Sequence, residues 1–240
     1  MVSLFIPVYN ARGFIKDNLR KSYNALLKLQ SDFEIFIVDD SSTDKSYKFA
    51  RIIDKARTVM ERDIKYVYYD NGPSRRENLA RTFYLAKGNI ICFIDADFSC
   101  DISYLLKAIE ILKEKPLDIV TGSRYIKGAK VKRRLVRRIL SFFYNLTIRV
   151  LFKSGIKDHQ CGLKVFRRST AMPIIDKMGY DDEFIRGWFW DAEFLIRAQR
   201  EKLKIMEMPV EWHESDVSTF NIRRELRCLK SIIALKRELN

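Results

Sequence analysis

The residues best suited to chemistry are two aspartates separated by one small residue, Asp95-Ala96-Asp97. They follow the apolar run 90–94, which has the length of a buried strand and is too short to span a membrane. Carboxylates at that end of a strand lie where open α/β sheets bind ligands, and they often hold a divalent cation on a diphosphate. An Asp-x-Asp at a strand end is also ordinary turn chemistry, so the elements around it must decide.

Polar residues also follow two other apolar runs. Tyr9 and Asn10 come after residues 2–8, and Asp39-Asp40 comes after residues 33–38. Helical segments separate these runs, which predicts a Rossmann-like α/β fold with a mostly parallel sheet and helices on both faces. Right-handed crossovers would place the strand ends on one edge, so that the polar clusters converge on one cleft. The expected strands are 2–8, 33–38, 64–69, 90–94, 118–125 and 205–210, and the expected helices are 12–29, one through 47–56 capped within 41–44, one through 79–86, 102–113, 135–150, one starting at 188, and 219–240.

The composition limits the classes of partner. The chain has 240 residues with 47% hydrophobic content, enough for a substantial core, and its net charge of +14 implies an anionic partner. A nucleic-acid partner is disfavoured because the acidic residues cluster at the strand ends, where they would repel it. Four cysteines without a CxxC pair and only two histidines argue against a zinc site and fit a reduced, cytosolic compartment. We expect no signal peptide and no membrane span.

A basic amphipathic helix is expected after residue 134. It could lie flat in a membrane interface with its basic face toward lipid phosphates, or it could be an ordinary surface helix whose apolar face packs on the core. A second basic amphipathic helix is expected at 219–240. The first helix carries Leu135, Ile139, Phe142, Phe143, Leu146 and Val150 on one face, and Arg134, Arg137, Arg138, Ser141, Asn145 and Arg149 on the other.

Several motifs together carry a resemblance to a known family. Residues 7–10, 38–44, 95–97 and 122–125, in that order, resemble the family 2 glycosyltransferases with the glycosyltransferase A fold, over about residues 1–215. The further motifs 158–166, 190–193 and 207–212 are similar to the polyprenyl-phosphate sugar synthases, and closer to the dolichyl-phosphate glucosyltransferase branch than to the mannose synthases. The resemblance implies a catalytic domain at 1–215, with a nucleotide-sugar-binding part at 1–125 and an acceptor-binding part at 126–215, followed by the basic helix 216–240.

The resemblance also implies a donor site. Pro7, Tyr9 and Asn10 would hold the base, Asp39 and Asp40 would contact the base and ribose, and Asp95 and Asp97 would bind the sugar diphosphate through Mg²⁺ or Mn²⁺. The chain departs from the family at 74–78, where a Gly-Lys-Gly type loop is usual. Arg75 would still be able to reach a phosphate there.

The acceptor side is expected to bind a phosphate. A lipid monophosphate, with a second pKa of about 6, is already largely anionic and needs charge compensation more than a general base. The predicted phosphate-binding residues are Arg124, Arg133, Arg134, Arg137 and Ser141. Asp158 stands where related enzymes carry a catalytic-site carboxylate, or it is a loop cap. Asp191 and Glu193 either line the acceptor side or serve as partners of a helix dipole. We expect the catalytic residues to be Asp97, Asp158 and Arg124, and we expect His159 to orient its loop and His213 to be structural.

The predicted activity is inverting transfer of a hexose to a polyprenyl or dolichyl phosphate. UDP-glucose is the first choice of donor and GDP-mannose the second. The enzyme would be peripheral on the cytoplasmic face of a membrane, alone or recruited by a separate membrane protein. The alternative keeps the fold but uses the hydroxyl of a saccharide or lipid-linked glycan as acceptor.

Overall fold

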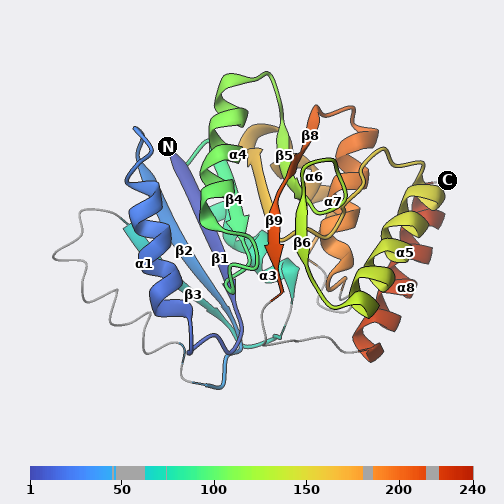
Figure 1. Cartoon of the computed structure of the whole chain (residues 1–240), viewed down its shortest axis with the longest axis horizontal. Coiled ribbons are helices and arrows are strands. Elements are labelled where there is room, and N and C mark those ends of the chain that lie inside the picture. Colours follow the sequence, from blue (N-terminus) through green and yellow to red (C-terminus); the bar gives the residue numbers. More distant parts are fainter. Residues whose placement is uncertain (45, 47–62, 74, 181–185, 215–221, 240) are drawn as a thin grey trace.

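In the computed structural model, a seven-stranded sheet runs through the molecule, and two long helices, α5 and α8, lie together at one end (Figure 1). The structure describes residues 1–44, 46, 63–73, 75–180, 186–214 and 222–239. The helix expected through 47–56 and the predicted domain boundary at 215/216 lie outside the described residues.

The sheet confirms the predicted α/β architecture. Its four N-terminal strands are parallel, and β7 is antiparallel to both of its neighbours, β4 and β5. Every residue of β2 and β4 is buried, as expected of parallel strands covered on both faces. The strand order is β3(Asp63–Tyr69), β2(Phe33–Asp40), β1(Val2–Val8), β4(Ile90–Ile94), β7(Leu163–Arg167), β5(Ile119–Ser123) and β8(Ile205–Pro209).

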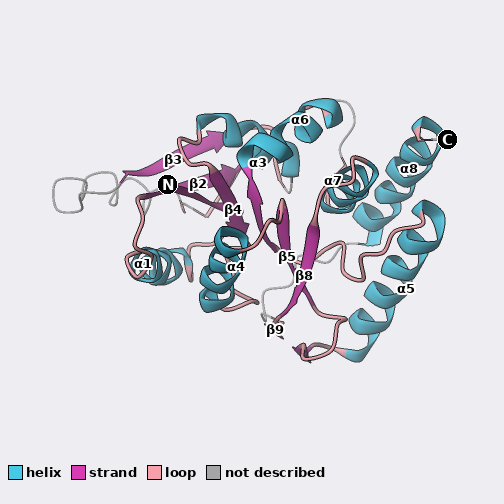
Figure 2. Cartoon of the chain, turned by 90° about the horizontal axis from the view of Figure 1, so that it is seen from above, coloured by secondary structure: helices cyan, strands magenta, loops and turns pink. Residues whose placement is uncertain are grey.

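Helices cover both faces of this sheet (Figure 2). On one side α1(Ile15–Leu26) and α4(Ile102–Glu114) pack on Leu4 and Ile6, and on the other side α3(Arg76–Thr82), α6(Arg168–Met178) and α7(Phe189–Arg200) pack around Phe5. Successive residues of β1 therefore enter opposite cores, as the alternation of side chains along a strand requires. Asp101 caps α4 by accepting a hydrogen bond from the Ser103 amide at 2.8 Å.

Short elements complete the fold. The 3₁₀ helix η2(Phe83–Leu85) extends α3, and β6(Lys130–Lys132) pairs in parallel with β9(Glu211–His213) in a separate two-stranded sheet. β9 thereby brings Trp212 and Glu214 to the same edge of the molecule as the carboxyl ends of β1, β2 and β4.

The orientation of α5(Leu135–Phe152) differs from the surface-helix interpretation. Its polar residues Ser141 and Asn145 face the protein, whereas Leu135 and Phe143 on the apolar face are 69% and 58% exposed. The predicted packing of the apolar face on the core is therefore wrong. The physical reason is that Asn145 accepts hydrogen bonds from the loop that enters β7, including the His159 amide at 2.8 Å. Arg138 and Arg149 of the predicted basic face are exposed, and the membrane-interface position stays a prediction.

The helix α8(Ile222–Glu238) packs against α5 and α7. Ile232 and Leu235 of α8 share a hydrophobic cluster with Ile148 and Phe152 of α5 and with Phe189 of α7. This packing places two amphipathic helices side by side at the end of the sheet (Figure 1).

An aromatic cluster under α3 is the densest part of one core. The ring of Phe83 lies 4.8 Å from that of Phe5, 5.6 Å from Phe166 and 6.5 Å from Trp190. We expect Phe83→Ala to lower the free energy of unfolding by about 3–5 kcal/mol, because a buried aromatic side chain is replaced by a cavity. Urea unfolding followed by circular dichroism measures this change.

The neighbouring Leu85, which is 53% exposed, provides the control. Leu85→Ala should change the free energy of unfolding by about 0.5 kcal/mol or less. A loss below about 1 kcal/mol for Phe83→Ala would show that this cluster does not stabilise the fold.

Candidate functional site

A cleft of about 250 Å³ lies at the carboxyl ends of β1, β2 and β4, and its volume is slightly below the usual range for small-molecule sites. The predicted convergence of Tyr9, Asp40 and Asp95 is therefore observed. Asp39, Arg134, Ser141, Asp158 and Glu193 are not among the residues that line it. The predicted site residues that do line it are Pro7, Tyr9, Asn10, Asp40, Arg75, Asp95, Asp97, Arg124, Arg133, Arg137 and Asp191.

Asp39 and Asp40 have different positions at the end of β2. Asp39 is held behind the cleft by the Tyr66 hydroxyl at 2.6 Å and the Ser42 amide at 2.8 Å. Asp40 lines the cleft and accepts hydrogen bonds from the Arg75 amide at 2.6 Å and from the Asn78 side chain. Burial raises the pKa of Asp40, although these bonds oppose the rise. Asp40 thus offers a fixed polar edge to a ligand.

Two glycines allow close backbone approaches at the cleft. A Cβ on Gly72 would lie 2.2 Å from the carbonyl oxygen of Asp40. A Cβ on Gly162 would lie 1.8 Å from the Asp95 carboxylate. The Gly162 carbonyl also accepts a hydrogen bond from the Asp95 amide at 3.1 Å, so the loop that enters β7 fixes Asp95 from behind.

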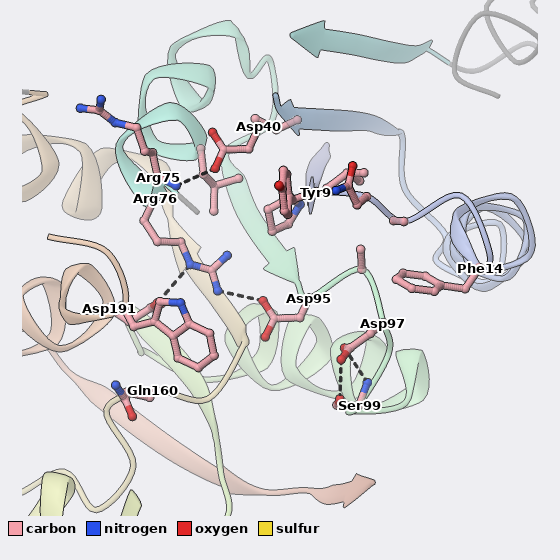
Figure 3. A pocket seen from close by; sticks show the side chains of 18 of the residues that line it. Tyr9, Phe14, Asp40, Arg75, Arg76, Asp95, Asp97, Ser99, Gln160 and Asp191 are labelled. Atoms are coloured by element: carbon pink, nitrogen blue, oxygen red, sulfur yellow. Dashed lines mark hydrogen bonds and ion pairs between the residues drawn. The ribbon is translucent and has the colours of Figure 1, made fainter. Parts of the chain in front are cut away.

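The two aspartates of the Asp95-Ala96-Asp97 motif have separate partners (Figure 3). Asp97 accepts hydrogen bonds from the Ser99 amide at 3.0 Å and from the Ser99 hydroxyl at 2.8 Å. Asp95 forms an ion pair of 2.8 Å with Arg76. Burial raises the pKa of Asp95, Arg76 lowers it, and the charge of Asp97 raises it further.

The Asp95 and Asp97 carboxylates fit a Mg²⁺ or Mn²⁺ that is shared with a substrate. Within the described part of the chain there is no cluster of three or more His, Cys, Asp or Glu placed to hold a metal. A cation here would therefore draw its remaining ligands from a diphosphate and water, which is the usual mode for Mg²⁺. Two carboxylates at the edge of an open cleft suit that mode.

Arg76 is a site residue that the sequence analysis did not identify. Its guanidinium lies between Asp95, at 2.8 Å, and Asp191, at 3.2 Å, whereas the Arg75 side chain points away from Asp95 (Figure 3). Burial lowers the pKa of Arg76, but the two carboxylates raise it more. Arg76 is thus a fixed cation beside the expected diphosphate position.

The helical geometry explains why only one of these two arginines faces Asp95. Arg75 is the N-cap of α3 and Arg76 is its first residue. The backbone of Arg75 is extended (φ −99°, ψ 100°), whereas Arg76 is helical, so the two side chains leave the backbone in different directions. The sequence shows two adjacent arginines, and the point at which α3 begins distinguishes them.

Arg124 and Asp158 form a buried bidentate ion pair. Arg124 Nε and Nη2 lie 2.7 and 2.8 Å from the two Asp158 oxygens, and the Arg124 amide donates to the same carboxylate at 2.9 Å. The Arg124 guanidinium also lies 4.9 Å from the ring centre of Trp212. Asp158 is fully buried, and although burial raises its pKa, Arg124 lowers it below the ordinary value. Asp158 is therefore placed to hold Arg124 in position, and it is not among the residues that line the cleft. Its predicted catalytic role stays a prediction.

The predicted phosphate-binding set is only partly assembled. Arg133 and Arg137 line the cleft together with Arg124. Arg134 is exposed and contributes only its amide, which donates to Glu214 at 3.0 Å. Ser141 is buried on the inner face of α5, and its hydroxyl has no hydrogen-bond partner among the described residues. Neither residue lines the cleft: Arg134 faces outward and Ser141 is buried.

Asp191 and Glu193 also differ in their positions relative to the cleft. Asp191 lines the cleft and pairs with the fully buried Lys164 at 2.8 Å as well as with Arg76. Glu193 is two residues further along α7 and pairs with Arg186 at 2.8 Å and with Arg197 at 2.9 Å. Of the two, only Asp191 lines the cleft.

The two histidines lie outside the cleft lining. His159 is fully buried, with its ring nitrogens 3.0 Å from Asn145 Oδ1 and 2.9 Å from Ser154 Oγ. Burial lowers the pKa of His159 to about 4, so the ring is neutral at physiological pH. Its contacts with Asn145 and Ser154 hold the loop in place. His213 is exposed and lies 2.9 Å from Glu211, which gives it no structural role in the core.

Comparison with known proteins identifies the family. Residues 3–173 match Glycosyl transferase family 2. The chain is 30% identical over 228 residues to the glycosyltransferase AglD of Haloferax volcanii, covering 94% of this chain and 35% of that protein. It is also 30% identical over 233 residues to the dolichyl-phosphate beta-glucosyltransferase of Saccharomyces cerevisiae, covering 90% of this chain and 68% of that protein.

A solved structure has the same fold. Glucosyl-3-phosphoglycerate synthase from Mycobacterium tuberculosis, in complex with Mn²⁺, UDP-glucose and phosphoglyceric acid, superposes with a TM-score of 0.66 at 15% identity, covering 98% of this chain and 77% of that chain. The present chain belongs to glycosyltransferase family 2 and has the glycosyltransferase A fold. It is a glycosyltransferase, and it spans about a third of the length of AglD.

The Arg124–Asp158 pair yields a stability prediction. We expect Asp158→Asn to lower the free energy of unfolding by about 3–5 kcal/mol, because it leaves the buried Arg124 charge without its counter-ion. Differential scanning calorimetry and urea unfolding measure the loss. Asp101→Asn is the control, since asparagine caps a helix about as well as aspartate. Equal stability of the two variants would contradict a positioning role for Asp158.

Proposed function

We propose that this glycosyltransferase moves a hexose from a nucleotide diphosphate sugar to the phosphate of a polyprenyl or dolichyl phosphate. The observation that carries the proposal is the polarity of the cleft. One end presents the Asp95 and Asp97 carboxylates beside Tyr9 and Asp40, and the other end presents the guanidinium groups of Arg124, Arg133 and Arg137. The dolichyl-phosphate beta-glucosyltransferase relatives support the same acceptor class.

The donor would occupy the carboxylate end. Asp40 and the loop of Pro7, Tyr9 and Asn10 would hold the nucleoside, and Asp95 and Asp97 would hold Mg²⁺ or Mn²⁺. Such a cation neutralises charge that develops on the departing diphosphate. Arg76 would add a second positive charge beside the same group. UDP-glucose is the favoured donor because the relatives include beta-glucosyltransferases, with GDP-mannose next.

The acceptor phosphate would lie at the arginine end. One of its oxygens forms the new bond to the anomeric carbon while the bond from that carbon to the diphosphate breaks, so the nucleoside diphosphate leaves and the configuration inverts. Arginine side chains suit phosphate oxygens because they donate paired hydrogen bonds. The electron pair for the new bond comes from an oxygen that is already ionised, so this step needs no proton acceptor.

The pairing of the carboxylates favours a phosphate over a hydroxyl acceptor. Asp191 is paired with Lys164 and Arg76, and Glu214 with Arg137. The oxygens of these carboxylates are engaged by cations, whereas a hydroxyl acceptor needs a free base to take its proton during attack. The alternative saccharide or lipid-linked glycan acceptor is therefore the second candidate.

A transfer assay tests this function. We expect incubation with UDP-glucose, Mn²⁺ and a short polyprenyl phosphate to yield a glucosylated lipid phosphate detected by mass, and the matched polyprenol, which lacks the phosphate, to yield none. GDP-mannose run in parallel tests the second donor. EDTA, or Asp97→Ala, should reduce the rate by about two orders of magnitude or more, because the diphosphate loses its counter-charge. Glucosylation of the alcohol but not of the phosphate would overturn the acceptor assignment.

We also propose that the enzyme works at an anionic membrane surface. The outward face of α5 is apolar, with Leu140, Phe142 and Phe143 each at least half exposed, and the exposed cations Arg138 and Arg149 lie on the same helix. In the described part of the chain no helix is long and apolar enough to cross a membrane. An apolar face flanked by arginines suits an interfacial helix that lies in the plane of the headgroups.

Substitutions at two equally exposed leucines test the proposed membrane binding. Leu140 on α5 is 50% exposed and Leu85 on η2 is 53% exposed, at different places in the fold. We expect Leu140→Glu to reduce co-sedimentation with phosphatidylglycerol vesicles, because it places a charge in the apolar face, and Leu85→Glu to have no effect. Equal pelleting of both variants, or no pelleting of the unchanged protein at low salt, would contradict the proposal. The latter result would favour recruitment by a separate membrane protein.

A further inference from the structure

Glu214 is the carboxylate at the arginine end of the cleft. Its side chain is only 15% exposed, and it forms an ion pair with Arg137 Nη1. One Glu214 oxygen also lies 3.7 Å from Arg133 Nε, and the other accepts a hydrogen bond from the Arg134 amide at 3.0 Å. Glu214 lines the cleft together with Arg124, Arg133 and Arg137. An internal anion thus stands within the arginine group that the proposed acceptor phosphate would contact.

Several cations are crowded around Glu214. Burial lowers the pKa of Arg133, and the neighbouring Arg124 charge lowers it further, as expected where cations are crowded. Burial raises the pKa of Glu214, but the Arg134 amide and Arg137 lower it below its ordinary value, so Glu214 is ionised at neutral pH. Arg133 Nε is buried without a hydrogen-bond partner among the described residues. The cluster therefore holds a donor that Glu214 does not satisfy.

We propose that Glu214 occupies the place of the acceptor phosphate in the free enzyme. Its carboxylate then balances the positive charges of Arg133 and Arg137, and a phosphate monoester displaces it when it binds. This inference rests on the proposed function. A phosphate monoester carries up to two negative charges and three acceptor oxygens, whereas Glu214 carries one charge and two oxygens. A dianion can therefore satisfy more of the guanidinium donors than Glu214 does.

Such a competing anion makes Glu214 a specificity-determining residue. A ligand that must displace an internal partner binds more weakly than its contacts alone would allow, and removal of the partner recovers the difference. A neutral hydroxyl acceptor has no charge with which to replace the Glu214 carboxylate on the arginines. Displacement of Glu214 therefore admits phosphate monoesters and rejects alcohols that have the same hydrocarbon chain.

Two glutamates on or next to β9 give a matched test. Glu211 pairs with the exposed His213 and does not line the cleft. We expect Glu214→Gln to bind inorganic phosphate and a short polyprenyl phosphate about tenfold more tightly, measured by isothermal titration calorimetry without donor, and Glu211→Gln to match the unchanged protein. In the transfer assay, Glu214→Gln should lower KM for the polyprenyl phosphate more than it changes kcat.

Unchanged or weaker phosphate binding by Glu214→Gln would overturn the inference. Tighter binding of inorganic phosphate but not of the lipid phosphate would show an anion site that is unrelated to the acceptor, and would also overturn it. Tighter binding of both without sugar transfer by either protein would leave the displacement of Glu214 standing and refute the proposed function. If Glu214→Gln fails to fold by thermal melting, Glu214→Asp, which withdraws the carboxylate by one methylene, replaces it in the same titrations.

Discussion

The buried ion pair between Arg124 and Asp158 joins the two halves of the cleft. Arg124 follows the end of β5, and Asp158 lies in the loop that enters the reversed strand β7, so their bidentate contact ties two neighbouring strands at one edge. The same loop continues to Gly162, which packs against Asp95 on the other side of β7. One loop thereby sets the positions of Asp95 and Arg124 together. The cost of burying the pair is offset by its bidentate geometry and by the Arg124 and Gln160 amides, which also donate hydrogen bonds to the Asp158 carboxylate.

The parts of the site that follow from local sequence were predictable. The buried runs that end in Asp40 and Asp95 could be recognised because parallel strands need apolar residues on both faces, and their polar ends must then share an edge. The roles of Arg76, Asp158 and Glu214 could not be recognised in this way. Each depends on which partner lies opposite in the folded chain, and that is decided by the point at which α3 begins, by the reversal of β7 and by the pairing of β6 with β9.

The orientation of α5 shows the limit of pattern reading most clearly. A helix with one apolar and one polar face is ordinarily expected to bury the apolar face. Here Asn145 satisfies the His159 amide and the Ser141 carbonyl, so the polar face has specific partners inside the protein. The sequence correctly indicated an amphipathic helix. Which of its faces points inward depends on the hydrogen bond between Asn145 and His159, fourteen residues further along the chain.

The helix α5 contributes both to the cleft and to the exposed apolar surface. Arg137 reaches the cleft from the first turn of α5, while Leu140, less than one turn later, faces outward. Residues three apart on a helix lie on adjoining faces, so the cleft and the apolar surface are next to each other on α5. If α5 lies in the headgroup layer, the cleft is next to that layer, and the hydrocarbon chain of a lipid acceptor can stay in the bilayer throughout the reaction. The search for an acceptor then takes place in two dimensions, at a height that the helix itself sets.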